Sequence, residues 1–254
     1  ITGVAPGDDT AAMLDCLERL GVPIAVSERN GQLVAAVIGN AGQLPDGPIT
    51  LPTRLAGTTS RFITAVASIG PGPYLVDGDP PLRERPMGPL HDSLLALGAR
   101  LEPEERPGHL PVTVSGPLRG ADAIVMPGNV SSQYVSALML IAPYIRRGLR
   151  LGLSTSLVSR PYVEITRSVM SAFGADDIEL ADRRIHVGEG GYFGSRYRVE
   201  PDASSASYPL AAAAMAGGAV CVRGLGSKAL QGDARFVDVM VEMASQGITM
   251  LCVT

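Results

Sequence analysis

One helical pattern recurs four times along the chain at nearly constant spacing, and this constrains the fold more than any other feature. Each copy places apolar residues at helical intervals and then a glycine, the residue that commonly ends a helix. The closing glycines are Gly21, Gly98, Gly174 and Gly247, which lie 77, 76 and 73 residues apart. This regularity predicts an internal structural repeat.

A second set of helices is expected between these, each beginning with small hydroxylated residues. The three starts are 57–60 (Gly-Thr-Thr-Ser), 131–133 (Ser-Ser-Gln) and 204–207 (Ser-Ser-Ala-Ser), with 74 and 73 residues between successive starts. Serine and threonine at a helix start are ordinarily caps. Free N–H groups and the positive end of the helix dipole also suit a phosphate or carboxylate. Both interpretations stay open at this point.

Short β-branched runs supply the strands of the repeat. Residues 24–38 form two such runs around Asn30-Gly31, which predicts a hairpin. Single strands are expected after the second-type helices at 74–76, 149–153 and 219–222. The repeating unit is therefore strand, helix, strand, strand, helix, strand in some cyclic order, which predicts a compact α/β protein.

Charge and composition limit the partners. The chain has 21 basic and 25 acidic residues and a formal net charge of -4, with no basic run suited to a nucleic-acid backbone. No stretch reaches the roughly 20 apolar residues of a membrane span. Some of the basic residues lie close together in three pairs: Arg83 with Arg85, Arg146 with Arg147, and Arg223 with Lys228. Such pairs indicate a small anionic metabolite as the ligand.

The cysteine, histidine and three aspartate residues that could take part in catalysis or metal binding are expected to be structural instead. The three cysteines lack CxxC spacing, which indicates a reducing, cytoplasmic compartment with Cys16 and Cys221 buried and Cys252 near the end. The three histidines, His91, His109 and His186, stand alone, so no metal site is expected. Asp8, Asp9 and Asp202 are expected to cap helices.

Six short sequence motifs, in this order, resemble the 5-enolpyruvylshikimate-3-phosphate synthase family, and together they span nearly the whole chain. They occupy residues 56–58 (AGT), 77–90 (DGDPPLRERPMGPL), 130–134 (VSSQY), 157–162 (LVSRPY), 200–208 (EPDASSASY) and 231–236 (QGDARF). The resemblance implies repeated βαβαββ units of the inside-out α/β barrel, with one nearly complete lobe at 1–199 and the beginning of a second at 200–254.

The resemblance also implies an activity in the shikimate pathway of aromatic amino-acid biosynthesis. The family transfers the enolpyruvyl group of phosphoenolpyruvate to the 5-hydroxyl of shikimate 3-phosphate, without metal or organic cofactor, and is the glyphosate target. Only these small-molecule substrates are implied as partners, with a cytoplasmic monomer as the complete protein.

The motifs that match the family also imply which residues bind the substrates. The resemblance assigns shikimate 3-phosphate to Ser131, Ser132, Gln133, Ser159 and Tyr162. It assigns phosphoenolpyruvate to Gly57, Arg85 and Gln133. It gives no proton-transfer residue within this chain, because the family's motifs that carry this role are expected before Ile1 and after Thr254. Leu55 and Phe62 depart from the asparagine and proline that many members carry.

Two other functions compete with this one. The sister enzyme UDP-N-acetylglucosamine enolpyruvyl transferase has the same repeats, but it usually carries a reactive cysteine shortly before its equivalent of Arg85, and residues 77–84 contain none. A lobe that binds shikimate 3-phosphate without catalysis is the second alternative. We therefore expect an enolpyruvyl transferase fragment that lacks activity by itself.

Overall fold

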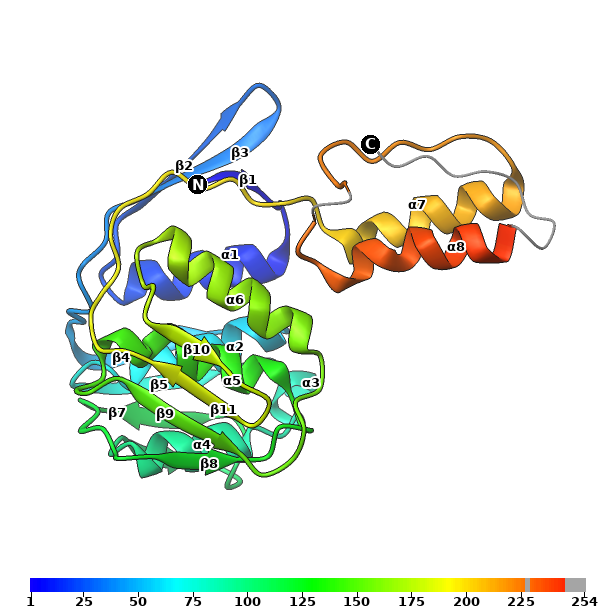
Figure 1. Ribbon diagram of the computed structural model, residues 1–254. Helices are drawn as coiled ribbons and strands as arrows, with labels where there is room; N and C mark the ends of the chain where they lie inside the picture. Colours follow the sequence, from blue (N-terminus) through cyan, green and yellow to red (C-terminus); the bar gives the residue numbers. More distant parts are fainter. Residues whose placement is uncertain (227–228, 245–254) are drawn as a thin grey trace. The chain divides into compact units, whose positions relative to one another are not determined.

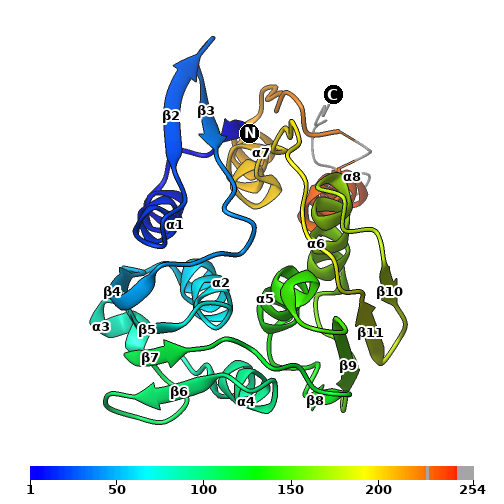
Figure 2. The same cartoon turned by 90° about the vertical axis from the view of Figure 1, so that its left-hand side faces the viewer.

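The computed structural model describes residues 1–226 and 229–244, and the chain divides into two compact units, Ile1–Tyr197 and Arg198–Thr254. The first unit contains three sheets with helices packed among them, and Figures 1 and 2 show it from two directions. The described part of the chain contains no helix that is both long and apolar enough to cross a membrane.

Two four-stranded sheets in the first unit have the same topology. The first has the order β4-β5-β7-β6 and the second the order β8-β9-β11-β10, each with one parallel pair followed by antiparallel strands. The strands are β4 Asp46–Pro52, β5 Gly72–Asp77, β6 Arg100–Pro103, β7 Val112–Ser115, β8 Ile124–Met126, β9 Leu149–Leu153, β10 Ile178–Leu180 and β11 Arg184–Val187. The predicted strand at 149–153 is confirmed, and the one at 74–76 lies within β5.

Helices connect these strands in the predicted order. The helices are α2 Gly57–Ala67, α3 Pro80–Arg83, α4 Gly88–Ala96, α5 Ser132–Ile141, the short 3₁₀ helix Ala142–Tyr144, and α6 Arg160–Ala172. Helices α2 and α5 link the two strands of each parallel pair, whereas α4 and α6 lead into the antiparallel hairpins. Each sheet therefore belongs to one βαβαββ unit, as the fold class requires.

The third sheet has three strands in the order β1-β3-β2, all antiparallel. Its strands are β1 Thr2–Val4, β2 Ile24–Arg29 and β3 Gln32–Val37, and helix α1 Asp8–Arg19 lies between β1 and β2. Asn30 and Gly31 between β2 and β3 have φ values of 52° and 72°. Positive φ at both positions is what a two-residue type I′ turn requires, so the predicted hairpin is confirmed.

The helices that were predicted to close with glycine do so in the same way three times. Gly21, Gly98 and Gly174 have φ values of 79°, 94° and 86°. The residue after each glycine donates its N–H to a carbonyl five residues earlier, at 3.0 Å in all three cases: Val22 to Leu17, Ala99 to Leu94, and Ala175 to Met170. This Schellman arrangement satisfies carbonyls that the helix leaves without partners. The fourth glycine, Gly247, lies outside the described residues.

Helix α5 is buried on almost every side, and Figure 2 shows it with α2 between the two four-stranded sheets. Eight of its ten residues are buried, among them Tyr134 and Leu138. Its polar Ser136 is satisfied by the hydroxyl of Thr166 on α6 at 2.7 Å. A helix that is apolar all round belongs in a protein core. Helix α5 therefore forms part of the core between the two four-stranded sheets.

The second unit contains α7 Ala203–Ala216, the short 3₁₀ helix Gly232–Arg235, and α8 Phe236–Ala244. Asp202 caps α7 by accepting from the N–H of Ser204 at 2.9 Å. Gln231 joins the two helical segments, because its Oε1 accepts from Ala203 N–H at 2.9 Å and its Nε2 donates to Pro201 O at 2.7 Å.

Three sequence predictions are wrong. Residues 219–222 form no strand, since no neighbouring strand in the described chain offers them a hydrogen-bonding ladder. Cys221 is consequently exposed, whereas Cys16 is buried as predicted and Cys252 lies outside the described residues. Asp8 and Asp9 belong to the first turn of α1, whose N-cap is Gly7, so neither is the cap.

Candidate functional site

The first turn of α2 lacks a side-chain cap. The helix begins at Gly57, and its N-cap is Ala56, which has no side-chain oxygen to accept a hydrogen bond. The first N–H groups of an α-helix have no partner within the helix. The N-terminus of α2 therefore presents unpaired donors and the positive end of the helix dipole.

Two guanidinium groups converge on this turn. A methyl group placed on Gly57 would lie 2.8 Å from Nη1 of Arg61 and 2.9 Å from Nη1 of Arg85. Only a residue without a side chain leaves both groups this close to the helix backbone. Two cations and the start of a helix thus surround one small space.

Arg61 is held in place without a carboxylate. Its Nη1 donates to Gly57 O at 3.0 Å and to Gln133 Oε1 at 2.6 Å. Its guanidinium carbon lies 5.6 Å from the centre of the Tyr134 ring, a cation–π contact. Its Nε is buried and has no hydrogen-bond partner in the described chain. The positive charge of Arg61 is therefore not neutralised by a neighbouring anion.

Gln133 joins the starts of α2 and α5. Its Nε2 donates to Thr58 Oγ1 at 2.9 Å while its Oε1 accepts from Arg61 at 2.6 Å. The N-cap of α5 is Ser131, whose Oγ accepts from the N–H of Gln133 at 3.3 Å. Ser132 is buried in the first turn. The capping interpretation thus holds for Ser131, whereas α2 is the helix with an uncapped start.

Arg85 reaches this space because its loop is anchored on both sides. On one side, the hydroxyl of Tyr134 donates to Pro86 O. On the other, Arg83 forms a bidentate pair with Asp77 at the end of β5, with Nη2–Oδ2 at 2.8 Å and Nε–Oδ1 at 3.0 Å. The backbone N–H of Arg85 donates to Leu82 O at 3.0 Å, but its side chain forms no hydrogen bond or ion pair within the described residues, so its guanidinium is available to a ligand.

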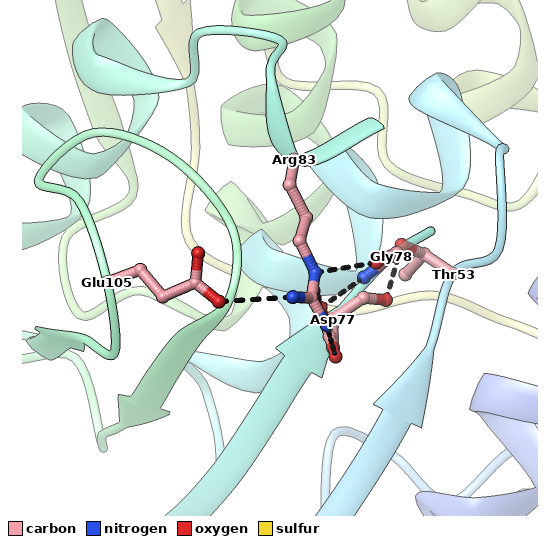
Figure 3. Close-up of polar contacts among 5 residues, drawn as sticks. All are labelled: Thr53, Asp77, Gly78, Arg83 and Glu105. Atoms are coloured by element: carbon pink, nitrogen blue, oxygen red, sulfur yellow. Dashed lines mark hydrogen bonds and ion pairs between the residues drawn. The ribbon is translucent and has the colours of Figure 1, made fainter. Parts of the chain in front are cut away.

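The Arg83 anchor is shown in Figure 3. Nη1 of Arg83 also contacts Glu105 at 3.1 Å, and Thr53 Oγ1 donates to the backbone carbonyl of Asp77 at 2.8 Å. The hydrogen bond to Asp77 raises the pKa of Arg83, which keeps the pair charged. Of the two arginines predicted to hold an anion here, Arg83 is already paired with Asp77, whereas the side chain of Arg85 has no partner among the described residues.

Ser159 and Tyr162 lie at the start of α6. Ser159 is the N-cap of this helix, in the left-handed region at φ 55°, and its side chain makes no capping bond. The preceding Val158 donates its N–H to Gly128 O at 3.0 Å, which pins this loop to the one that leads into Ser131. Tyr162 is about half exposed. The loops that precede α5 and α6 therefore lie together.

The structure thus brings together Gly57, Arg85, Ser131 and Gln133, from three segments of the first unit. The third hydroxylated start, at Ser204, lies in the second unit. Arg146 and Arg147 do not join the site: both are exposed, and Arg147 pairs with Asp122 at 3.4 Å. Lys228 lies outside the described residues.

Sequence reasoning missed two contributors. Arg61 on α2 and Tyr134 on α5 received no role, although the four-residue step from Gly57 to Arg61 places these two residues on one face of α2. The described residues contain no cluster of three or more histidine, cysteine, aspartate or glutamate side chains that could hold a metal ion. The site combines cationic groups, amide and hydroxyl groups and helix N–H donors, which suits binding of a phosphate or carboxylate.

Comparison with known proteins shows the family. Residues 1–250 match the family described as EPSP synthase (3-phosphoshikimate 1-carboxyvinyltransferase). A curated protein of that name from Trichormus variabilis is 38% identical over 240 residues, covering 94% of this chain and 56% of the relative. One from Methanoculleus marisnigri is 40% identical over 237 residues, covering 92% and 55%. The chain spans about half the length of the curated relatives it matches.

A solved structure supports the fold. The EPSP synthase from Acinetobacter baumannii aligns with a TM-score of 0.69 at 24% identity, covering 83% of this chain and 46% of that one. The observed βαβαββ units agree with this likeness. By sequence and by fold, the chain belongs to the EPSP synthase (3-phosphoshikimate 1-carboxyvinyltransferase) family.

Proposed function

We propose that this chain forms the part of a 3-phosphoshikimate 1-carboxyvinyltransferase that binds shikimate 3-phosphate and helps to bind phosphoenolpyruvate. In the complete reaction the 5-hydroxyl oxygen of shikimate 3-phosphate bonds to C2 of phosphoenolpyruvate. The C2–O bond to phosphate then breaks, and phosphate leaves. The 5-hydroxyl proton is lost, while the proton added to the methylene carbon during addition is removed during elimination.

The observation that carries this proposal is the pair of guanidinium groups at the uncapped start of α2. Both Arg61 and Arg85 lie within 3 Å of a methyl group placed on Gly57, and no carboxylate pairs with either one in the described chain. Like charges this close are unfavourable without an anion between them. Phosphoenolpyruvate carries both a phosphate and a carboxylate, each of which an arginine can bind with two hydrogen bonds.

Shikimate 3-phosphate is proposed to lie beside this pair, at the starts of α5 and α6. Ser131, Ser132 and Gln133 are at the first of these starts, and Ser159 and Tyr162 are at the second. The bond between Val158 and Gly128 keeps the two loops together, so donors from both can meet one phosphate. Gln133 then lies between the two substrates, because it already contacts Arg61 and Thr58.

We extend the proposal to the lobe boundaries, the oligomeric state and the cellular location of the protein. Residues 1–199 form the first lobe, and residues 200–254 form the beginning of the second. The complete protein is proposed to be a cytoplasmic monomer and a target of glyphosate. The names and lengths of the curated relatives support the assignment of this chain to part of a larger enzyme.

The test is a calorimetric titration of the 254-residue chain with shikimate 3-phosphate, and then with phosphoenolpyruvate in its presence. Replacing Arg85→Gln should weaken phosphoenolpyruvate binding about tenfold or more, since a charge-assisted pair is lost, and should leave shikimate 3-phosphate binding nearly unchanged. Arg106→Gln is the matched control, because Arg106 is exposed and its side chain pairs, within the part of the chain that the structure describes, with Glu84 alone, at 3.0 Å. Equal phosphoenolpyruvate affinity in both variants would contradict the proposed role of Arg85.

A further inference from the structure

A hollow lies on the other face of the sheet that carries α5 and α6. Along β9, Leu149, Leu151 and Leu153 are buried, and the residues between them face the opposite side. Figure 2 shows α5 and α6 on one side of the strands β9, β11 and β10. The hollow on the opposite side has a volume of about 640 Å³, within the range of pockets that bind small molecules.

Strand register brings three basic side chains around one glycine. Arg150 on β9 lies opposite His186 on β11, and Gly152 lies opposite Arg184. Arg150 and Arg184 are therefore diagonal neighbours on the same face, with Cα atoms about 7–8 Å apart, a separation that long side chains easily bridge. All four residues line the hollow.

The floor between these basic residues is apolar and open. Val125 on β8 pairs with Gly152 and is 70% exposed, so its side chain is open to a ligand. A methyl group on Gly152 would contact only Val125 Cγ2 at 3.3 Å and Ile124 O at 3.7 Å within 4 Å. Gly152 therefore leaves space above the sheet, bounded on one side by the Val125 methyl groups.

The charge of the hollow is positive on the Gly152 side. Neither Arg150 nor Arg184 forms an ion pair with any described carboxylate. Glu179 also lines the hollow, opposite His186 and therefore diagonal to Arg184, and Asp177 is 3.8 Å from the Nε2 of His186. A ligand above Gly152 therefore lies beside two guanidinium groups that form no ion pair with a described carboxylate, and Glu179 lies on the β10 side of Arg184.

We propose that this hollow binds a small aromatic carboxylate. The ring lies over Gly152 against Val125, and one guanidinium stacks on the exposed ring face. The other guanidinium binds the carboxylate with two hydrogen bonds. The apolar floor favours such a ligand over inorganic phosphate, which offers nothing for Val125 to cover. The site shares no residue with the candidate functional site described above.

The probe is benzoate, titrated into the isotopically labelled 254-residue chain and followed by NMR. We expect saturable shifts of the Gly152 and His186 amides with a Kd on the order of 1 mM, and no shifts at Gly57 or Gln133. Inorganic phosphate at equal concentration should bind at least about tenfold more weakly, since it lacks a ring. Shifts confined to Gly57 and Gln133, or phosphate binding as tight as benzoate, would overturn the proposal.

Three variants and a control locate the ligand. Arg150→Gln and Arg184→Gln should each weaken benzoate binding about tenfold or more, because each removes a charge-assisted contact. Gly152→Val keeps both charges but fills the space for the ring, so it should abolish binding. Arg183→Gln is the matched control: Arg183 is exposed and adjacent in sequence, yet it does not line the hollow.

Circular dichroism should show that each variant is folded, because the replaced side chains lie on the outer face. Wild-type affinity in either Arg150→Gln or Arg184→Gln would overturn the assignment of the carboxylate. Retained benzoate binding in Gly152→Val would overturn the position of the ring. Neither result would bear on phosphoenolpyruvate binding at Arg85, which is measured separately.

Discussion

At the scale of single residues, His91 on α4 is a polar group that the fold holds in an apolar place. It is 5% exposed, and its buried Nε2 has no hydrogen-bond partner among the described residues. Burial lowers the pKa of His91 to about 4, because the protonated ring would be charged away from water. The neutral form is therefore the one that the folded protein contains near neutral pH.

This burial predicts a loss of stability in acid. Between about pH 6.5 and pH 4 the unfolded chain binds a proton at His91 that the folded chain does not, so the free energy of unfolding falls as pH falls. A shift of this size corresponds to about 3 kcal/mol. His91→Leu should remove this part of the pH dependence, as measured by urea unfolding at pH 7 and pH 4.5. An unchanged slope with pH would show that His91 is accessible to protons.

Gly57 permits a second prediction at this scale. A side chain there would meet the ends of the Arg61 and Arg85 side chains, at 2.8 and 2.9 Å, and of these two Arg61 is held by hydrogen bonds to Gly57 O and Gln133. Gly57→Ala should therefore lower the free energy of unfolding by about 1–3 kcal/mol, because the Arg61 guanidinium must give up these hydrogen bonds. Phosphoenolpyruvate binding should weaken, because the guanidinium groups must turn away. Calorimetry and urea unfolding of the same preparation measure both quantities, and unchanged binding would place the ligand elsewhere.

At the scale of elements, the start of α5 combines a cap with a proposed phosphate site. The Oγ of Ser131 accepts from Gln133 N–H at 3.3 Å, so Ser131→Ala should cost about 1 kcal/mol of stability. Ser131→Asp keeps a capping oxygen but adds a negative charge. At 4 Å from the ligand phosphate and an effective dielectric constant of 20, this charge repels by about 4 kcal/mol.

The two variants therefore separate the roles of Ser131. The aspartate variant should be as stable as wild type in urea unfolding yet fail to bind shikimate 3-phosphate by calorimetry. The alanine variant should be less stable and bind more weakly. If the stable aspartate variant bound shikimate 3-phosphate with wild-type affinity, Ser131 would be a cap only.

At the scale of the whole molecule, local signals predicted much of the fold and tertiary contacts decided the rest. The Asn30-Gly31 turn and the closing glycines were predictable because their backbone conformations depend on neighbours in sequence. Residues 219–222 have the composition of a strand, but a strand also needs a partner that composition does not report. The site shows the same division. Gly57, Arg85 and Gln133 came from resemblance, whereas the role of Arg61 could be recognised only from its three-dimensional contacts with Gln133 and Tyr134.

The division of the chain into Ile1–Tyr197 and Arg198–Thr254 leads to the last prediction. The first unit contains a continuous core drawn from helix α1 and from both four-stranded sheets with their helices, whereas the buried cluster among the described residues of the second is Ala203, Ala206, Leu210 and Leu225. The few buried side chains in the described part of this unit cannot by themselves offset the conformational entropy of ordering it. Residues 1–197 alone should therefore unfold cooperatively, with a Tm within about 2 °C of the full chain in calorimetry. Because Ser131, Gln133 and Ser159 all belong to this unit, it should also keep the shikimate 3-phosphate affinity of the full chain. A large fall in Tm or in affinity on removal of residues 198–254 would show that the second unit supports the first.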